Sequence, residues 1–206
     1  MEQFISQTPV ATIIFLFTIA TSLYAFSNAE IYGKFMLHPY SVSRGQRVYT
    51  VITSGLIHKD WGHLFMNMLS YYFFAFQLET MIGHFAFAVL YIASLALSDL
   101  STILKHKEDF WYNSLGASGA VSAVIFSYIL YNPFTQMIIF PLPIPIPAVI
   151  FGVLYLVYSA YASKQGGGNI NHDAHFLGAI SGIIITVIFY PQVIPHFINE
   201  ISGVFQ

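Results

Sequence analysis

The stretch "FWYNSLGASGAVSAVIFSYILYNPFTQMIIFPLPIPIPAVIFGVLYLVYSAYAS", residues 110–163, contains no Asp, Glu, Lys or Arg. A membrane-spanning helix needs about 20 largely apolar residues, so this interval is too long for one helix. It is interrupted by an Asn-Pro pair at 132–133 and by "PLPIPIP" at 141–147. Proline lacks an amide donor and biases the residue before it towards extended geometry. We therefore expect two helices here, at about 116–131 and 147–162.

The composition places the chain in the membrane. Of its 206 residues, 56% are hydrophobic and 8% are charged, whereas soluble domains carry about 25% charged residues. The net charge of -2 gives no basic footprint for nucleic acid. Cysteine is absent, which excludes disulfides, thiolate catalysis and cysteine-bound metals. At this length we expect one domain over residues 1–206.

Other apolar intervals predict the remaining spans. Closed backbone hydrogen bonding makes helices the natural spanning elements, so the fold class is an all-α polytopic bundle. The first apolar run is long enough to span and lacks the basic start of a signal peptide, so we expect a retained helix. The connection at 27–60 is rich in aromatic and apolar residues, so it either lies in the interface or packs on the bundle, or it is an ordinary ordered loop. The four further helices are expected at about 9–26, 61–80, 83–103 and 174–191.

A serine stands among small residues in "GASG", residues 116–119. Small residues often let membrane helices pack closely, and this is one interpretation of Gly116 and Gly119. The other is that the Ser118 hydroxyl performs chemistry inside the bundle, because polar side chains in spanning helices often mark function.

A histidine begins the last helix in "HDAHFLGAISG", residues 172–182. Gly178 and Gly182 follow His175 by three and seven residues, so all three share one helical face. Glycines on that face would let a neighbouring helix approach His175, although a lone interfacial anchor is the alternative. Asp173 is a plausible N-cap for this helix.

A third polar set is "HLFMN", residues 63–67. His63 and Asn67 are four residues apart and therefore lie side by side on one helical face. They either form interhelical hydrogen bonds or serve a common site.

Together the three sets predict acyl transfer by a serine enzyme. A serine hydroxyl needs a neighbouring base, and a neutral imidazole is the usual one near pH 7. Attack on an amide creates an oxyanion that needs fixed hydrogen-bond donors. Ser118, His175 and the pair His63 and Asn67 would supply nucleophile, base and donors.

At these residues the chain resembles the rhomboid family of intramembrane serine proteases. The resemblance rests on "HLFMN", "GASG" and "AHFLGAISG", in this chain order and on these helices, and it covers nearly the whole chain. It implies a six-helix bundle with a long structured first loop. It also implies that Ser118 is the nucleophile and His175 the general base, in a dyad without a third acid. His63, Asn67 and the Ser118 amide would stabilise the oxyanion.

The resemblance has further implications for the rest of the chain. Glu79, followed by Gly83, looks like the family's buried structural carboxylate. The helix at 147–162 and the loop Gly166–Gly168 would form a mobile gate for substrate and water. Partners would be single-span transmembrane proteins and membrane lipids, with no nucleic acid and no cofactor, and the oligomeric state is left open.

The sequence departs from the family pattern in two places. Many members carry an aromatic residue one turn after the serine, stacked on the catalytic imidazole, but that position is Ser122 here, and another aromatic could replace it. The Trp-Arg pair often seen in the first loop is not evident. Asp173 lies two residues before His175, so its side chain should point elsewhere if the helix begins at Ala174, and we expect a cap or a solvated loop charge rather than a third member of a triad. His172 and His175 do not make a metal site, which needs three or four ligands.

A non-catalytic rhomboid-like protein that binds transmembrane helices, or a small transporter, is the rival interpretation. Retained Ser118 and His175 argue against the first. No inverted repeat is visible between the two halves, which weakens the second.

Two signals disagree about the orientation of the chain in the membrane. All seven basic residues fall in the first, third and fifth connections, which the positive-inside rule would place in the cytoplasm. The family resemblance places them outside, with both termini in the cytoplasm, and we follow it because four of the seven sit in the long structured first loop. We expect a bacterial inner membrane.

Overall fold

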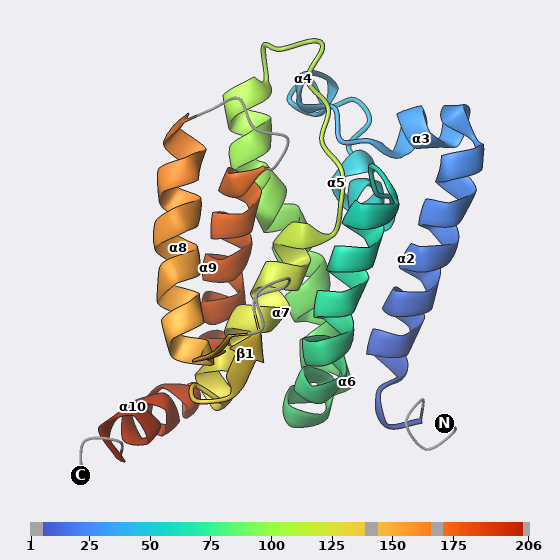
Figure 1. Cartoon of the computed structure of the whole chain (residues 1–206). Helices are drawn as coiled ribbons and strands as arrows, with labels where there is room; N and C mark the ends of the chain where they lie inside the picture. Colours follow the sequence, from blue (N-terminus) through green and yellow to red (C-terminus); the bar gives the residue numbers. More distant parts are fainter. Residues whose placement is uncertain (1–5, 139–143, 166–170, 204–206) are drawn as a thin grey trace.

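The computed structural model describes residues 6–138, 144–165 and 171–203. It is a bundle of long apolar helices with short elements at both ends (Figure 1). This confirms the predicted class, an all-α membrane bundle with a structured first loop. The main helices are α2 (Pro9–Ser27), α6 (Trp61–His106), α7 (Ser118–Tyr131), α8 (Ala148–Gln165), α9 (His172–Phe189) and α10 (Val193–Gly203).

The helix α6 contains a reversal of direction. Gly83 leaves the helical region with φ 75° and ψ 162°, a conformation that glycine adopts at little cost. Figure 1 shows the two halves of α6 running in opposite directions on either side of this point. The break falls at the predicted start of the second of the two helices that the sequence predicts at 61–80 and 83–103.

Three of the described helices, α2, α6 and α9, are long and apolar enough to cross a membrane, and α7 is apolar but shorter. The chain is therefore an integral membrane protein. The count of six crossings and the single-domain boundary stay predictions.

Helix α7 occupies the middle of the bundle. It packs mainly against α6 and α9, and its residues 119–124 and 126–129 are all buried. In Figure 1 the chain descends from one end of the molecule into the bundle before α7 begins. The start of α7 is thereby placed inside the protein rather than at its surface.

The first connection packs on the bundle. It forms α3 (Ala29–Phe35), α4 (Pro39–Val42), α5 (Thr50–Thr53) and the 3-10 turn η1 (Ser54–Leu56). Leu37 and Ile57 are fully buried, and Leu37 makes an antiparallel bridge to Ser114. The Arg47 guanidinium donates to the carbonyls of Gly33 (2.6 Å) and Met36 (3.3 Å). These contacts hold the connection over the segment that leads into α7.

A two-stranded sheet lies at the opposite end of the bundle. Strand β1 (Gln136–Ile138) runs antiparallel to β2 (Pro145–Pro147), with Met137 opposite Ile146. The alternating prolines predict extended geometry, as observed, but the pairing with β1 was not predicted. Residues 139–143 lie outside the described part of the chain.

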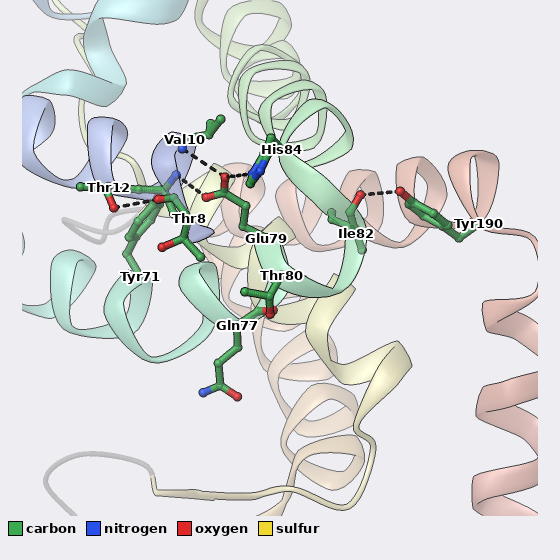
Figure 2. A network of polar contacts seen from close by, with 11 residues as sticks. Thr8, Val10, Thr12, Tyr71, Gln77, Glu79, Thr80, Ile82, His84 and Tyr190 are labelled. Carbon is green, nitrogen blue, oxygen red and sulfur yellow. Dashed lines mark hydrogen bonds and ion pairs between the residues drawn. The ribbon is translucent and has the colours of Figure 1, made fainter. Parts of the chain in front are cut away.

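A buried carboxylate joins α6 to the start of α2 (Figure 2). Glu79 has no exposed surface and accepts hydrogen bonds from the backbone amides of Val10 (3.1 Å) and Ala11 (2.6 Å). His84 Nδ1 lies 2.6 Å from the same carboxylate. The first amides of a helix have no partner within it, so Glu79 supplies what the start of α2 lacks.

Candidate active site

The segment that enters α7 lies against His63. Gly116 has φ +114°, a conformation that L side chains rarely adopt, and its amide donates to the Ser54 carbonyl (2.9 Å). A Cβ built on Gly116 would lie 2.5 Å from Cε1 of His63. Glycine is therefore required here both by the backbone conformation and by the imidazole of α6. The contact brings His63 within two residues of Ser118.

Helices α7 and α9 touch backbone to backbone. A Cβ at Gly178 would overlap the carbonyl group of Gly119, and a Cβ at Gly182 would overlap Ala123 one turn further on. A Cβ at Gly119 would overlap the side chain of Ser98 and lie 3.4 Å from the Ala174 carbonyl oxygen. The small-residue interpretation of these glycines thus describes a real close approach.

This close approach fixes the positions of Ser118 and His175 along the axes of α7 and α9. Ser118 directly precedes Gly119 on α7, and His175 directly follows Ala174 and precedes Gly178 by three residues on α9. Both side chains are half-buried. They are not hydrogen-bonded to each other in this structure. Catalytic hydrogen bonds are often long or misaligned in the absence of substrate, so the geometry leaves the dyad as a hypothesis.

Ser118 is the first residue of α7. The amides of a helix's first turn have no carbonyl partner within the helix, and the helix dipole adds partial positive charge there. The start of α7 therefore offers backbone donors beside the Ser118 hydroxyl.

His63 and Asn67 belong to the first two turns of α6. Asp60 caps this helix by accepting from the His63 amide (2.8 Å). The Asn67 Nδ2 donates to the His63 carbonyl (3.0 Å), which leaves one of its two protons free for another acceptor. The Asn67 side chain is thus oriented by its own helix rather than by another one.

His63 has a second imidazole beside it. The ring of His58 lies 5.0 Å from that of His63, at 73°, and its Nδ1 is 2.9 Å from the Ser22 hydroxyl. Burial lowers the pKa of His58 to about 3, assisted by the neighbouring His63. His58 is therefore uncharged at neutral pH and adds no positive charge to this end of α6.

An aromatic residue from α8 covers His175. The ring of Tyr155 lies 6.3 Å from the imidazole and 17° from parallel, and its hydroxyl is 2.7 Å from the Ser122 hydroxyl. Sequence reasoning left open which aromatic could replace the one missing at position 122. No local signal could identify Tyr155, since it is distant along the chain and on another helix.

The start of α9 differs from the prediction. The helix begins at His172, two residues earlier than expected, and its N-cap is Asn171, whose side chain accepts from the Ala174 amide (3.1 Å). The assignment of Asp173 as N-cap is wrong. Asp173 lies in the first turn, where it pairs with Lys105 (2.8 Å) and accepts from the Ser163 hydroxyl. It is thereby engaged away from His175, as a structural acid.

The remaining predicted features are placed as follows. Glu79 lies in the network at the start of α2, away from α7. The helix proposed as a gate is α8, and the loop Gly166–Gly168 lies outside the described residues. Within the described ranges no three His, Asp or Glu side chains gather where they could hold a metal ion.

Comparison with known proteins gives a consistent result. The model of the Rhomboid domain matches residues 45–192. "RHOMBOID-like protein 12, mitochondrial" of Arabidopsis thaliana is 27% identical over 71% of this chain and 49% of its own length. "Rhomboid protein 1, mitochondrial" of Saccharomyces cerevisiae is 29% identical over 66% of this chain and 40% of its own.

A bacterial protein is similar at the same level. "Putative rhomboid protease YdcA" of Bacillus subtilis is 27% identical over 67% of this chain and 65% of its own length. The chain spans about half the length of the first relatives it matches, the Arabidopsis and yeast mitochondrial proteins.

Proposed function

Because this chain belongs to the rhomboid family, we propose that it is an intramembrane serine endopeptidase that cleaves single-span transmembrane proteins near the membrane surface. The observation that carries the proposal is the backbone contact of Gly119 with Gly178. That contact holds the helix that begins with Ser118 against the helix that carries His175, inside an apolar bundle.

The reaction follows from the residues at this contact. The Ser118 oxygen attacks the scissile carbonyl carbon while His175 takes the hydroxyl proton. The proton then passes to the leaving amine as the peptide bond breaks. A water molecule attacks the resulting ester, giving its proton to His175, and the Ser118 oxygen leaves and recovers that proton. Each tetrahedral stage places negative charge on the former carbonyl oxygen.

The donors for that charge come from two helices. The free amides at the start of α7 and the remaining Asn67 proton are suited to an oxyanion, and the imidazole of His63 lies against the same segment. Fixed donors in a water-poor site are usually the largest single contribution to catalysis. Asp173 takes no part, since it is paired with Lys105.

A fluorophosphonate probe in detergent tests the proposal directly. The Ser118 oxygen should bond to phosphorus as fluoride leaves and the proton passes to His175. We expect one adduct per chain, at Ser118, absent in Ser118→Ala. In His175→Ala the labelling rate should fall by about a hundredfold or more, as expected for loss of a general base.

A neighbouring serine provides the control. Ser114→Ala, on the segment leading into α7, should be labelled like the unaltered protein. Equal labelling of the Ser118→Ala variant, or no labelling of a folded unaltered protein, would leave the non-catalytic rhomboid-like protein as the better description.

The membrane in which the protein acts is a further part of the proposal. Two relatives are mitochondrial and chloroplastic by name, and a third is from the bacterium Bacillus subtilis. They therefore do not favour a bacterial inner membrane over an organelle membrane. Its location there and the cytoplasmic termini remain predictions from the sequence.

A further inference from the structure

Tyr155 is the residue that joins the three helices around the proposed base. Its hydroxyl reaches Ser122 of α7 (2.7 Å), and its ring faces His175 of α9 (6.3 Å, 17°). Phe126 of α7 and Phe151 of its own helix flank it, each with ring centroids 5.6 Å away. Two ring contacts and a hydrogen bond restrain Tyr155, and the imidazole stacked beside it is thereby restricted as well.

His175 has few other fixed contacts. Within the described residues its ring nitrogens make no hydrogen bond, and its other ring contact is with His172, nearly perpendicular to it at 6.1 Å and 81°. Asp173 is paired elsewhere. A base in a serine enzyme must nevertheless be held in one orientation, because small misplacements of reacting groups are costly. The parallel ring of Tyr155 is the contact that can do this.

We propose that Tyr155 is a positioning residue that orients the His175 imidazole for proton transfer from Ser118, with the Ser122 hydroxyl as its anchor. This rests on the proposed serine protease function and deepens it. Offset-stacked rings with centroids 4.5–7 Å apart are one of the two favoured arrangements of aromatic pairs, and the hydrogen bond to Ser122 restrains the ring of Tyr155 beside the imidazole.

The position of α8 then controls the base. Within the described residues of α8, only Ala148, Gly152 and Ser159 are buried. At its far end α8 is held by the Ser163 hydroxyl bonded to Asp173. Outward movement of this helix would carry Tyr155 away from both Ser122 and His175. Many of its large side chains face outwards: Ile150, Val153, Leu154, Val157, Tyr158 and Tyr161.

The test separates the ring from the hydroxyl. In Tyr155→Leu, which removes the ring, kcat on a transmembrane substrate should fall by about tenfold to a hundredfold, the scale of a 1 Å misplacement. KM should change little, since Tyr155 acts on His175 and not on the substrate. Tyr155→Phe keeps the ring and should lose only roughly twofold to tenfold, the range of one neutral hydrogen bond.

Ser122→Ala removes the same hydrogen bond from its other end. It should therefore match Tyr155→Phe, and the double variant should lose no more than either alone, because residues that share one interaction are not additive. If Tyr155→Leu fails to fold, these two variants and their combination still decide the matter. Losses that multiply in the double variant would overturn the anchor role of Ser122.

The fluorophosphonate probe separates positioning from gating. The probe is small and needs no transmembrane helix to enter, so its labelling rate reports on the Ser118–His175 pair. We expect the rate in Tyr155→Leu to fall in parallel with kcat. An unchanged rate, at unchanged thermal stability, would overturn the positioning role while leaving the protease function intact.

Tyr161→Leu is the matched control, since Tyr161 lies on the same helix and is 63% exposed. It should label and cleave like the unaltered protein. An equal loss in Tyr161→Leu would assign the effect to α8 as a whole and overturn the specific role of Tyr155. Absence of labelling in the unaltered protein would instead contradict the proposed function itself.

Discussion

At the scale of single residues, the site depends on glycines that have no room for a side chain. Gly178 faces the backbone of α7, where a Cβ would meet the carbonyl group of Gly119. Backbone atoms cannot move aside as a flexible side chain can, so the helices themselves must separate. The same pair sets the level of Ser118 and His175, so separation would affect stability and chemistry together.

We therefore expect Gly178→Ala to lower the free energy of unfolding by about 1–3 kcal/mol, the usual cost of overpacking. Thermal unfolding in detergent measures this, and probe labelling of Ser118 should slow in the same variant. The matched control is Gly33→Ala, where nothing lies within 4 Å of the new Cβ. Gly33 is inside α3, and there alanine should be neutral or stabilising by up to about 1 kcal/mol. Equal stability of the two variants would contradict the close approach.

Sequence reasoning reached the motif residues but not all of their partners. The spacing of His175, Gly178 and Gly182 predicted a close approach by another helix, and periodicity carries that information because the three residues share one helix face. It could not reveal that Tyr155 faces His175, because that contact joins helices that are not local in sequence. The N-cap was misplaced because Asn171 and Asp173 are both good capping residues, and only the observed start of α9 decides between them.

At the scale of helices, the charge-free intervals and proline breaks predicted where the long helices lie, since apolar length and lost amide donors act locally. The pairing of β1 with β2 and the burial of the first connection depend on contacts between distant segments. The antiparallel bridge of Leu37 to Ser114 is one example. Such contacts leave no periodic signal in the chain.

The start of α2 gives a prediction at this scale. Glu79→Ala should leave the amides of Val10 and Ala11 without their acceptor, at about 1–3 kcal/mol for a buried unsatisfied donor. Thermal unfolding in detergent should show the loss. Glu30→Ala is the control, since Glu30 is exposed and pairs with Lys34 on α3, and surface changes of this kind usually stay within about 0.5 kcal/mol. A similar melting temperature for the two variants would remove Glu79 from its capping role.

At the scale of the whole molecule, the two ends of the bundle differ in charge. All seven basic residues lie in the first, third and fifth connections or in the last helical turns beside them, at the end that carries α3 and α4. The start of α2 and the helix α10 are both at the other end, on opposite sides of the bundle (Figure 1). At the basic end, several of the cations are paired: Arg44 with Glu108 (2.9 Å), Lys105 with Asp173 (2.8 Å) and Arg47 with backbone carbonyls.

Because much of this charge belongs to a folded first connection rather than to short free loops, we expect it to be a weak topology signal. Reporters fused before α2 and after Gln206 should both be active in the cytoplasm. A fusion after Gln206 that is active only on the opposite side of the membrane would reverse the orientation. It would also place the first connection in the cytoplasm, as the positive-inside rule expects.

The carboxylate beneath α2 has a consequence for biosynthesis. Ala11 and Glu79 are 68 positions apart, so the start of α2 is synthesised well before its hydrogen-bond acceptor. Until Glu79 is in place, the two amides at the start of α2 must donate to water or to lipid headgroups instead. The hydrogen bonding at the start of α2 is therefore completed only after the first half of α6 has been synthesised and has packed against it.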